Sequence, residues 1–180
     1  RDPDLPERVH EDLQQINSQA ERAARIVQNL LLFAREHKPQ RLLIDINETM
    51  RSTLSLRAYQ LRVDNIRVVT DLDPELPHTV ADPFQLQQVF LNLINNANHA
   101  MTQRGGQGTL TLRTASVPPS ETVSGRPMIR VSVSDTGIGI PERDLNRIFD
   151  PFFTTKPVGQ GTGLGLSICF GIVQEHGGRI

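Results

Sequence analysis

The chain has 180 residues, enough for one domain of moderate size with an additional element. Its 19 basic and 20 acidic residues give a formal net charge of −1. Neither sign forms a long block, so the composition argues against binding to nucleic acid or to an anionic membrane surface. The single Cys169 cannot form an internal disulfide, which favours a reducing compartment.

No apolar run approaches the roughly 20 residues of a membrane span, and no signal peptide is visible. We therefore expect a cytoplasmic domain, whose parent protein is either soluble or anchored in a membrane. Because the chain starts with Arg1 and not with Met, we expect a fragment of a longer protein.

A long helix is predicted at the start of the chain. Asp4 is a candidate N-cap, with Pro6 in the first turn and Glu7 placed as in a capping box. Apolar residues then recur at alternating steps of four and three: Val9, Leu13, Ile16, Ala20, Ala23, Val27, Leu30 and Ala34. This stripe fits a helix that folds back on its own domain, but its narrow width is typical of association with other long helices. The pattern ends at Pro39.

Strands and a helix alternate in the next forty residues. Residues 41–47 read as a strand, and Asn47 is a candidate cap for a helix that carries Met50 and Leu61 on its apolar face. Residues 66–72 alternate as a strand should, and residues 78–81 form another short strand after a proline-marked turn.

A second capping box, Asp82-Pro83-Phe84-Gln85, opens the helix of most interest. Helical spacing puts four polar residues on one narrow face: Gln88, Asn92, Asn96 and His99. The opposite face is predicted to be apolar, with Leu86, Phe90, Leu93, Ala97 and Ala100. A single buried asparagine usually bridges neighbouring backbone, whereas two on one face suggest a ligand.

Asp135 ends the last predicted strand. After a glycine-rich turn at residues 104–108 and a strand at residues 109–115, the strand from Ile129 carries Val131 and Val133 on the same face as Asp135. We therefore expect the Asp135 carboxylate to face the helices and to need hydrogen-bond donors there. The alternative is an exposed aspartate in a turn.

Two glycine clusters follow within about thirty residues. Gly137 and Gly139 come directly after Asp135, and Gly161, Gly163 and Gly165 open an apolar helix predicted over residues 164–176. Such glycines let backbone N–H groups approach a ligand, and a helix N-terminus attracts an anion. The second cluster matches neither a P-loop nor a dinucleotide-binding turn. A phosphate-bearing nucleotide is the expected ligand.

Together, the frame N-L-I-N-N-A at residues 92–97, the two glycine clusters and the phenylalanines 149, 152 and 153 resemble four sequence boxes of one family. It is the ATP-binding domain shared by sensor histidine kinases, the DNA gyrase B subunit, heat-shock chaperone ATPases and mismatch-repair proteins. The histidine kinase branch fits best, and residues 19–35 look like the second helix of that branch's dimerisation domain. The resemblance covers essentially the whole chain.

The resemblance implies a nucleotide and metal site. Asn96 would carry the Mg²⁺ that bridges the ATP phosphates, with Asn92 beside it as the other catalytic residue, and Asp135 would accept from the adenine amino group. Lys156 would lie in a lid over the phosphates, and His99 at a position often given to a phosphate-contacting cation. The full set implied to bind the nucleotide is Asn92, Asn96, His99, Asp135, Gly137, Gly139, Ile140, Lys156, Gly161, Thr162, Gly163, Leu164 and Gly165.

The implied fold is α+β, a two-layer α/β sandwich of the Bergerat type, with a mixed sheet on three helices after one long coiled-coil helix. Residues 1–40 would be the partial dimerisation domain and residues 41–180 the ATP-binding domain, without its last strand or hairpin. The implied reaction transfers the ATP γ-phosphoryl group to a histidine on an upstream dimerisation helix, of the same or the partner subunit in a homodimer. An aspartate of a response-regulator receiver domain would then take the phosphoryl group.

Two other functions remain open at this point. One is an ATP-hydrolysing clamp of the gyrase or chaperone type, which uses a glutamate to activate water where this chain has Asn92, an amide that cannot act as a base. The other is a nucleotide-binding module without catalysis. His10-Glu11 superficially resembles an acceptor motif, but Asp12 and Gln15 stand where that motif has an apolar residue and a proline. We therefore expect that this fragment alone cannot phosphorylate itself.

Overall fold

The computed structural model describes residues 40–122, 125–157 and 161–180, and before them residues 9, 12, 13, 15–17 and 20. The described residues before position 21 are helical and exposed. Most of the predicted long helix over residues 4–36, including its capping box at Asp4 and its coiled-coil stripe, lies outside the described residues.

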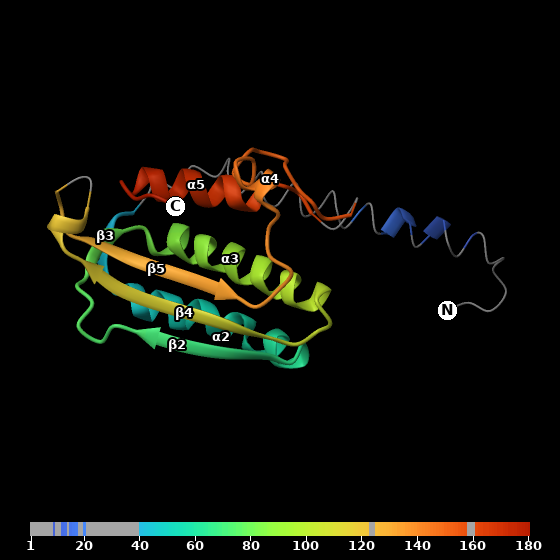
Figure 1. The fold of residues 1–180 in the computed structure, drawn as a ribbon, viewed down its shortest axis with the longest axis horizontal. Coiled ribbons are helices and arrows are strands. Elements are labelled where there is room, and N and C mark those ends of the chain that lie inside the picture. The colour runs from blue at the N-terminus through green and yellow to red at the C-terminus, as the bar shows by residue number, and fades with distance from the viewer. Residues whose placement is uncertain are drawn as a thin grey trace.

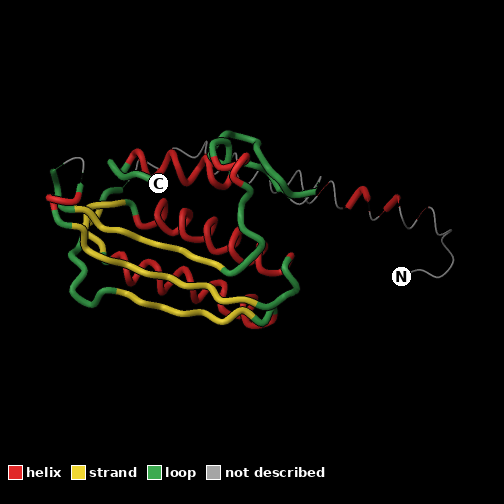
Figure 2. The backbone as a smooth tube through the Cα atoms, viewed as in Figure 1, coloured by secondary structure: helices red, strands yellow, loops and turns green. Residues whose placement is uncertain are grey.

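The domain is a two-layer sandwich, as the sequence predicts (Figure 1). One layer is a mixed three-stranded sheet in the order β2-β4-β5, in which β2 (Ile66–Leu72) runs parallel to β4 (Gly108–Val117) and β5 (Met128–Asp135) antiparallel to it. The other layer contains α2 (Ile46–Val63), α3 (Pro83–Gln103) and α5 (Gly165–Glu175). A single-turn 3-10 helix (Pro119–Glu121) lies between β4 and β5, and the short α4 (Glu142–Leu145) interrupts the long loop between β5 and α5 (Figure 2).

Helix α3 lies at the centre of the helical layer. It packs against α2, α5, β4 and β5, and its buried residues are Val89, Phe90, Ile94, Ala97, Asn98 and Met101. Leu86 and Leu93, which the sequence suggested for the apolar face, are only partly buried. The face is rotated toward Ile94 and Met101 because α3 is covered from two sides, by the sheet and by its neighbouring helices. Burying each such side chain contributes about 1.5–3 kcal/mol.

The strand predicted over residues 41–47 is shorter than expected. β1 (Leu42–Ile44) pairs antiparallel with β3 (Thr79–Ala81) in a separate two-stranded sheet. The chain leaves β1 at Asp45, which is the N-cap of α2 and accepts hydrogen bonds from the backbone N–H groups of Asn47 (2.7 Å) and Glu48 (3.2 Å). The prediction of Asn47 as the cap is therefore wrong, because the aspartate two residues earlier satisfies the first turn.

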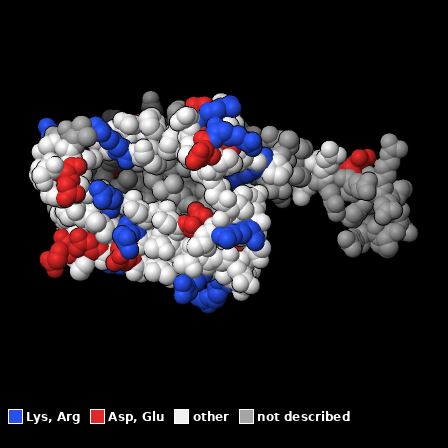
Figure 3. Space-filling model, viewed as in Figure 1, with Lys and Arg blue, Asp and Glu red and all other residues white. Residues whose placement is uncertain are grey.

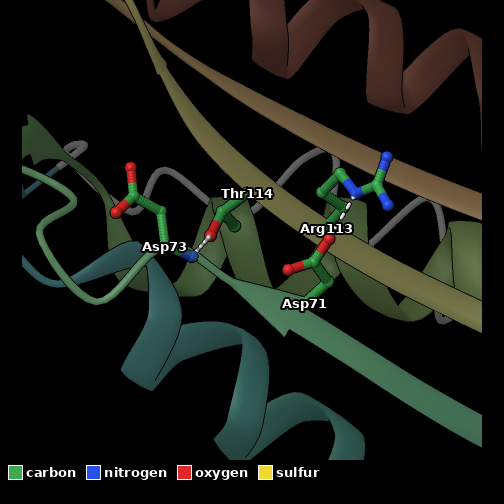
Figure 4. Close-up of polar contacts among 4 residues, drawn as sticks. All are labelled: Asp71, Asp73, Arg113 and Thr114. Carbon is green, nitrogen blue, oxygen red and sulfur yellow. Dashed lines mark hydrogen bonds and ion pairs between the residues drawn. The ribbon is translucent and has the colours of Figure 1, made fainter.

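Asn47 instead belongs to a buried polar network that joins α2 to the sheet. Its Nδ2 donates to the carbonyl of Asp73 (2.8 Å), and its Oδ1 accepts from the Thr114 hydroxyl (2.8 Å). The Thr114 Oγ1 in turn accepts from the Asp73 N–H at 3.0 Å (Figure 4). Asn47 and Thr114 are 4% and 3% exposed. The network fixes the start of α2 against the ends of β2 and β4.

The outer face of the sheet is polar. Figure 3 shows basic and acidic residues interspersed on this side of the molecule, with no continuous block of either sign. Arg113 and Asp71 form an ion pair there, at 2.7 Å between Nε and Oδ2 (Figure 4). Among the described residues, no helix is long and apolar enough to cross a membrane.

The buried network and the exposed ion pair give a matched test of stability. Thr114→Val leaves the Asp73 N–H and the Asn47 Oδ1 without their partner, and we expect it to lower the free energy of unfolding by about 1–3 kcal/mol. Arg113→Ala removes an ion pair whose side chains are both 62% exposed, and we expect a loss of about 0–1 kcal/mol. Urea denaturation of both variants measures the difference, and equal losses would contradict it.

Candidate functional site

The candidate site is built on the polar face of α3. Asp82 caps this helix by accepting from the N–H groups of Phe84 (2.9 Å) and Gln85 (3.1 Å), and Pro83 occupies the first turn, as predicted. Further along the helix, Asn92, Asn96 and His99 project from its polar face, and all three are half-buried. The helix is held firmly at its start and by its core, so these side chains project from a fixed position.

Asn92 contacts the second glycine cluster. Its Nδ2 donates to the carbonyl of Gly165 at 3.2 Å. Gly165 is the first residue of α5 and Leu164 its N-cap, and no side chain caps this helix end. Because the first turn of α5 leaves backbone N–H groups free of helical partners, this end of α5 suits an anion.

Lys156 reaches the neighbouring asparagine from the loop before α5. Its Nζ donates to the Asn96 Oδ1 at 3.3 Å. Burial lowers the pKa of Lys156, while burial and then the nearby Lys156 charge lower the pKa of His99. Both groups therefore favour their neutral forms more than usual. The Nε2 of His99 is buried without a hydrogen-bond partner among the described residues. A bound anion would favour the charged form of Lys156 and a protonated Nε2 on His99, and would so offset the cost of burying them.

The first glycine loop docks on the C-terminal part of α3. The Ile138 N–H donates to the Ala100 carbonyl (3.2 Å), and a Cβ on Gly137 would lie 2.6 Å from the carbonyl carbon of Ala100. Only glycine therefore fits at position 137. Gly139 has a φ of 72°, a left-handed conformation that glycine adopts without strain. Ala100 is four residues after Asn96, about 6 Å along the helix axis, so this loop lies beside the polar face.

The expectation of a buried Asp135 is wrong for this structure. It is the last residue of β5, in the predicted alternation, and pairs with Leu110, but its side chain is exposed. The carboxylate accepts from the Gly137 N–H at 2.8 Å and so turns with the loop at the end of β5. Ile140, further along the same loop, is 51% exposed. The alternation rule fails here because β5 ends at Asp135, and the carboxylate bonds to the loop that follows.

The second glycine cluster bonds back to the loop between β5 and α5. Phe152 has a φ of 68°, unusual for a bulky residue, and its N–H donates to the Gly163 carbonyl at 3.0 Å. Gly163 itself has a φ of 67°, and a Cβ there would overlap the Phe152 backbone. A Cβ on Gly161 would contact the Thr154 hydroxyl and the Lys156 stem. The Thr162 hydroxyl accepts weakly from the Leu164 N–H (3.4 Å).

Sequence reasoning missed two supports of the site. Arg104, just after α3, donates from Nη1 to the Thr136 carbonyl at 2.6 Å, and the Thr136 hydroxyl accepts from the Thr109 N–H at 2.9 Å. Neither residue has a local signal, because an arginine in a turn is usually a solvated charge. The positive φ of Phe152 could not be predicted either, because bulky residues such as phenylalanine rarely adopt one.

Two alanine substitutions, one at Gly163 and one at Gly171 in α5, test the close approach of Gly163 to Phe152. Alanine at position 163 requires a left-handed backbone, at a cost of about 1–2 kcal/mol, and also overlaps Phe152; we expect Gly163→Ala to destabilise the chain by at least that amount. Gly171→Ala is the control, because Gly171 lies inside α5 with open space around its Cα. There alanine should stabilise the helix by up to about 1 kcal/mol. Thermal unfolding of both variants gives the comparison, and shifts in the same direction would rule out the tight Gly163–Phe152 approach.

The donor set fits a nucleotide better than a metal ion alone. No group of three His, Cys, Asp or Glu side chains that could hold a metal exists within the described part of the chain. An amide oxygen that already accepts an ammonium, as Asn96 does from Lys156, can equally face Mg²⁺, which keeps much of its coordination for water and substrate phosphates. The residues present therefore fit a metal that arrives with phosphates.

Comparison with known proteins identifies the family. Residues 81–180 match the model of the histidine kinase-, DNA gyrase B- and HSP90-like ATPase family, so the chain belongs to this family of ATPases. Within it, the predicted resemblance to the ATP-binding domain of sensor histidine kinases is confirmed by named relatives.

One relative is the sensor kinase CckA of Brucella abortus (strain 2308), 38% identical over 99% of this chain and 19% of its own length. Among solved structures, the catalytic domain of histidine kinase ThkA in a nucleotide-free form superposes with a TM-score of 0.64 at 34% identity, over 76% of this chain and 81% of that one. ThkA in complex with the response regulator TrrA gives a TM-score of 0.69 at 29% identity, over 97% and 47%. The chain thus spans about a fifth of the length of CckA.

Proposed function

We propose that this chain binds Mg-ATP and donates the γ-phosphoryl group to a histidine on a dimerisation helix, as the kinase component of a two-component system. The observation that carries the proposal is the pair of contacts from one face of α3: Asn92 to the glycine cluster at Gly165, and Asn96 to the lid lysine, Lys156. Phosphates entering between these groups would meet backbone N–H donors, an ammonium and an amide oxygen together.

Each residue has a distinct role in this proposal. Asn96 would hold Mg²⁺ through its amide oxygen, and the metal when bound neutralises phosphate charge during transfer. Lys156 would move from the Asn96 oxygen to a phosphate oxygen. Asp135 would accept from the adenine amino group with its exposed carboxylate. Phosphoryl transfer needs little covalent chemistry from the protein, so positioning and charge are the main requirements.

A clamp that hydrolyses ATP is the less favoured function. It needs a general base to activate water, and Asn92 is an amide whose nitrogen already donates to Gly165. Transfer to a histidine needs no such base at this position. The partners proposed are a homodimeric parent protein, in which residues 1–40 form part of the dimerisation domain and residues 41–180 the ATP-binding domain, and a response-regulator receiver domain. A relative, ThkA, has been solved with a response regulator.

Asp135 should decide which base is bound. Asp135→Ala removes a charge-assisted hydrogen bond to adenine, and we expect ATP affinity to fall about 10- to 100-fold, equivalent to about 1.5–3 kcal/mol. Titration calorimetry with ATP and GTP measures this, and the wild-type chain should prefer ATP strongly. Asp71→Asn, at an exposed ion pair on the outer sheet face, is the control and should leave affinity unchanged. Equal ATP affinity for wild type and Asp135→Ala would refute the adenine assignment.

Asn96 should decide whether binding depends on magnesium. We expect Mg²⁺ to strengthen ATP binding to the wild-type chain, and Asn96→Ala to lose most of that enhancement because the amide oxygen is gone. The neighbouring Asn95 is exposed on a different side of α3, so Asn95→Ala should behave as wild type. ATP affinity measured in Mg²⁺ and in EDTA gives the ratio for all three proteins. An unchanged ratio in Asn96→Ala would remove this residue from the metal site.

A further inference from the structure

Helices α3 and α5 are joined along their length by polar contacts as well as by packing. The chain directions are opposite, since the start of α5 meets the middle of α3 and the end of α5 meets the N-cap of α3. From the nucleotide end outward, the contacts are Asn92 to Gly165, Cys169 to the Val89 carbonyl (3.8 Å), Gln85 to Glu175 (3.1 Å) and His176 to Asp82 (3.0 Å). The His176 contact lies furthest from the proposed phosphates.

Both nitrogens of the His176 ring have defined partners. The Nε2 lies 3.0 Å from the backbone nitrogen of Asp82, and the Nδ1 lies 2.8 Å from the Ile172 carbonyl oxygen. A backbone N–H can only donate and a carbonyl can only accept, so Nδ1 carries the proton and Nε2 is the acceptor. The ring thus makes one contact within α5 and one contact to α3.

The bond from the Asp82 N–H to His176 replaces a bond within α3. In a complete capping box, the side chain three residues after the cap accepts from the N–H of the capping residue, and Gln85 is placed to do so. Instead, the Asp82 N–H goes to His176, and Gln85 donates through Nε2 to Glu175 while its Oε1 is buried without a partner among the described residues. The predicted capping box is therefore only half formed. The N-terminus of α3 has exchanged a local bond for bonds to α5.

Few apolar side chains of α5 reach the core. Of its eleven residues only Cys169 and Ile172 are fully buried, with Ile168 and Val173 partly buried against the core, and α5 packs chiefly on α3 (Figure 1). Apolar contacts have no preferred direction, whereas a hydrogen bond at 3.0 Å is directional. The polar contacts at the two ends of α5 therefore set its position along α3.

We propose that His176 is a positioning residue for nucleotide binding: its Nε2 fixes the register of α5 on α3 and thereby holds the Gly161–Gly165 cluster against Asn92. The inference rests on the proposed nucleotide function of that cluster. His176 does not itself touch the nucleotide, because it lies at the opposite end of α5, about 16 Å away along an eleven-residue helix.

Two substitutions separate this role from simple capping of α5. The amide of glutamine reaches the position of the histidine Nε2, so His176→Gln keeps an acceptor for the Asp82 N–H and loses the bond to Ile172. The amide of asparagine reaches the position of Nδ1, so His176→Asn keeps the bond to Ile172 and loses the one to Asp82. In His176→Asn, Gln85 can complete the capping box of α3, so this variant should remain folded.

ATP affinity is the first measurement. We expect His176→Gln to bind Mg-ATP within about threefold of wild type, and His176→Asn to bind at least about tenfold more weakly. The reverse order would show that the ring only caps α5, and wild-type affinity in both variants would show that the ring does not set the site. Either result overturns the proposal.

The only cysteine of the chain provides a second measurement that needs no nucleotide. Cys169 lies on α5, is 0% exposed and contacts the Val89 carbonyl of α3. Burial raises the pKa of its thiol to about 11. Its reaction with a disulfide reagent under native conditions therefore reports separation of α5 from α3. We expect this reaction to be faster in His176→Asn than in wild type or His176→Gln.

The two measurements separate the two proposals. If the wild-type chain does not bind ATP, the proposed function fails, while the thiol rates still test whether His176 holds α5 on α3. If the wild-type chain binds ATP but the thiol of His176→Asn reacts no faster than that of wild type, the function stands and the role of His176 is refuted.

Discussion

Helix α3 has to be buried and yet remain polar on one side, and the rest of the domain is arranged around this requirement. Its apolar face is covered by the sheet and by α2, with Ile94 and Met101 completely enclosed. Its polar face would leave Asn92 and Asn96 without partners if α5 packed there with an ordinary apolar surface. Two contacts resolve the conflict: Gly165 offers a backbone carbonyl to Asn92, and Lys156, from the loop before α5, donates to Asn96.

The loop between β5 and α5 contains one strained residue. This loop closes on itself where the Phe152 N–H meets the Gly163 carbonyl. This closure holds Phe152 in a left-handed conformation, although the residue is 71% exposed. Such a conformation costs of order 1–3 kcal/mol and persists only where the surroundings impose it. Binding energy from a ligand that orders the loop would offset this cost.

Hydrogen bonds fix the start of α2 on the sheet and the end of α5 on the start of α3. Asn47, Thr114 and Asp73 join α2 to the sheet through buried hydrogen bonds, and Asp82 and His176 join α3 to α5. In each case a residue at a helix end, Asn47 at the start of α2 or His176 at the end of α5, bonds to another element. Hydrogen bonds of this kind contribute only about 1 kcal/mol each, but they are directional. They set where the helices lie, while apolar burial supplies most of the stability.

Local patterns in the sequence determined the elements and the residue types of the site. Alternation predicted β2 and β5, the cap at Asp82 predicted the start of α3, and the spacing of Asn92, Asn96 and the glycines indicated a nucleotide. These signals are local, since periodicity and capping act over a few residues. The boundary of β1 and the cap of α2 were misplaced because Asp45 and Asn47 compete for the same role two residues apart. Only the folded chain decided the direction of the Asp135 side chain, the left-handed Phe152, the contact of Lys156 with Asn96 and the partner of His176. The contacts of Phe152, Lys156 and His176 join residues that are 11 to 94 positions apart, and such contacts leave no periodic trace in the sequence.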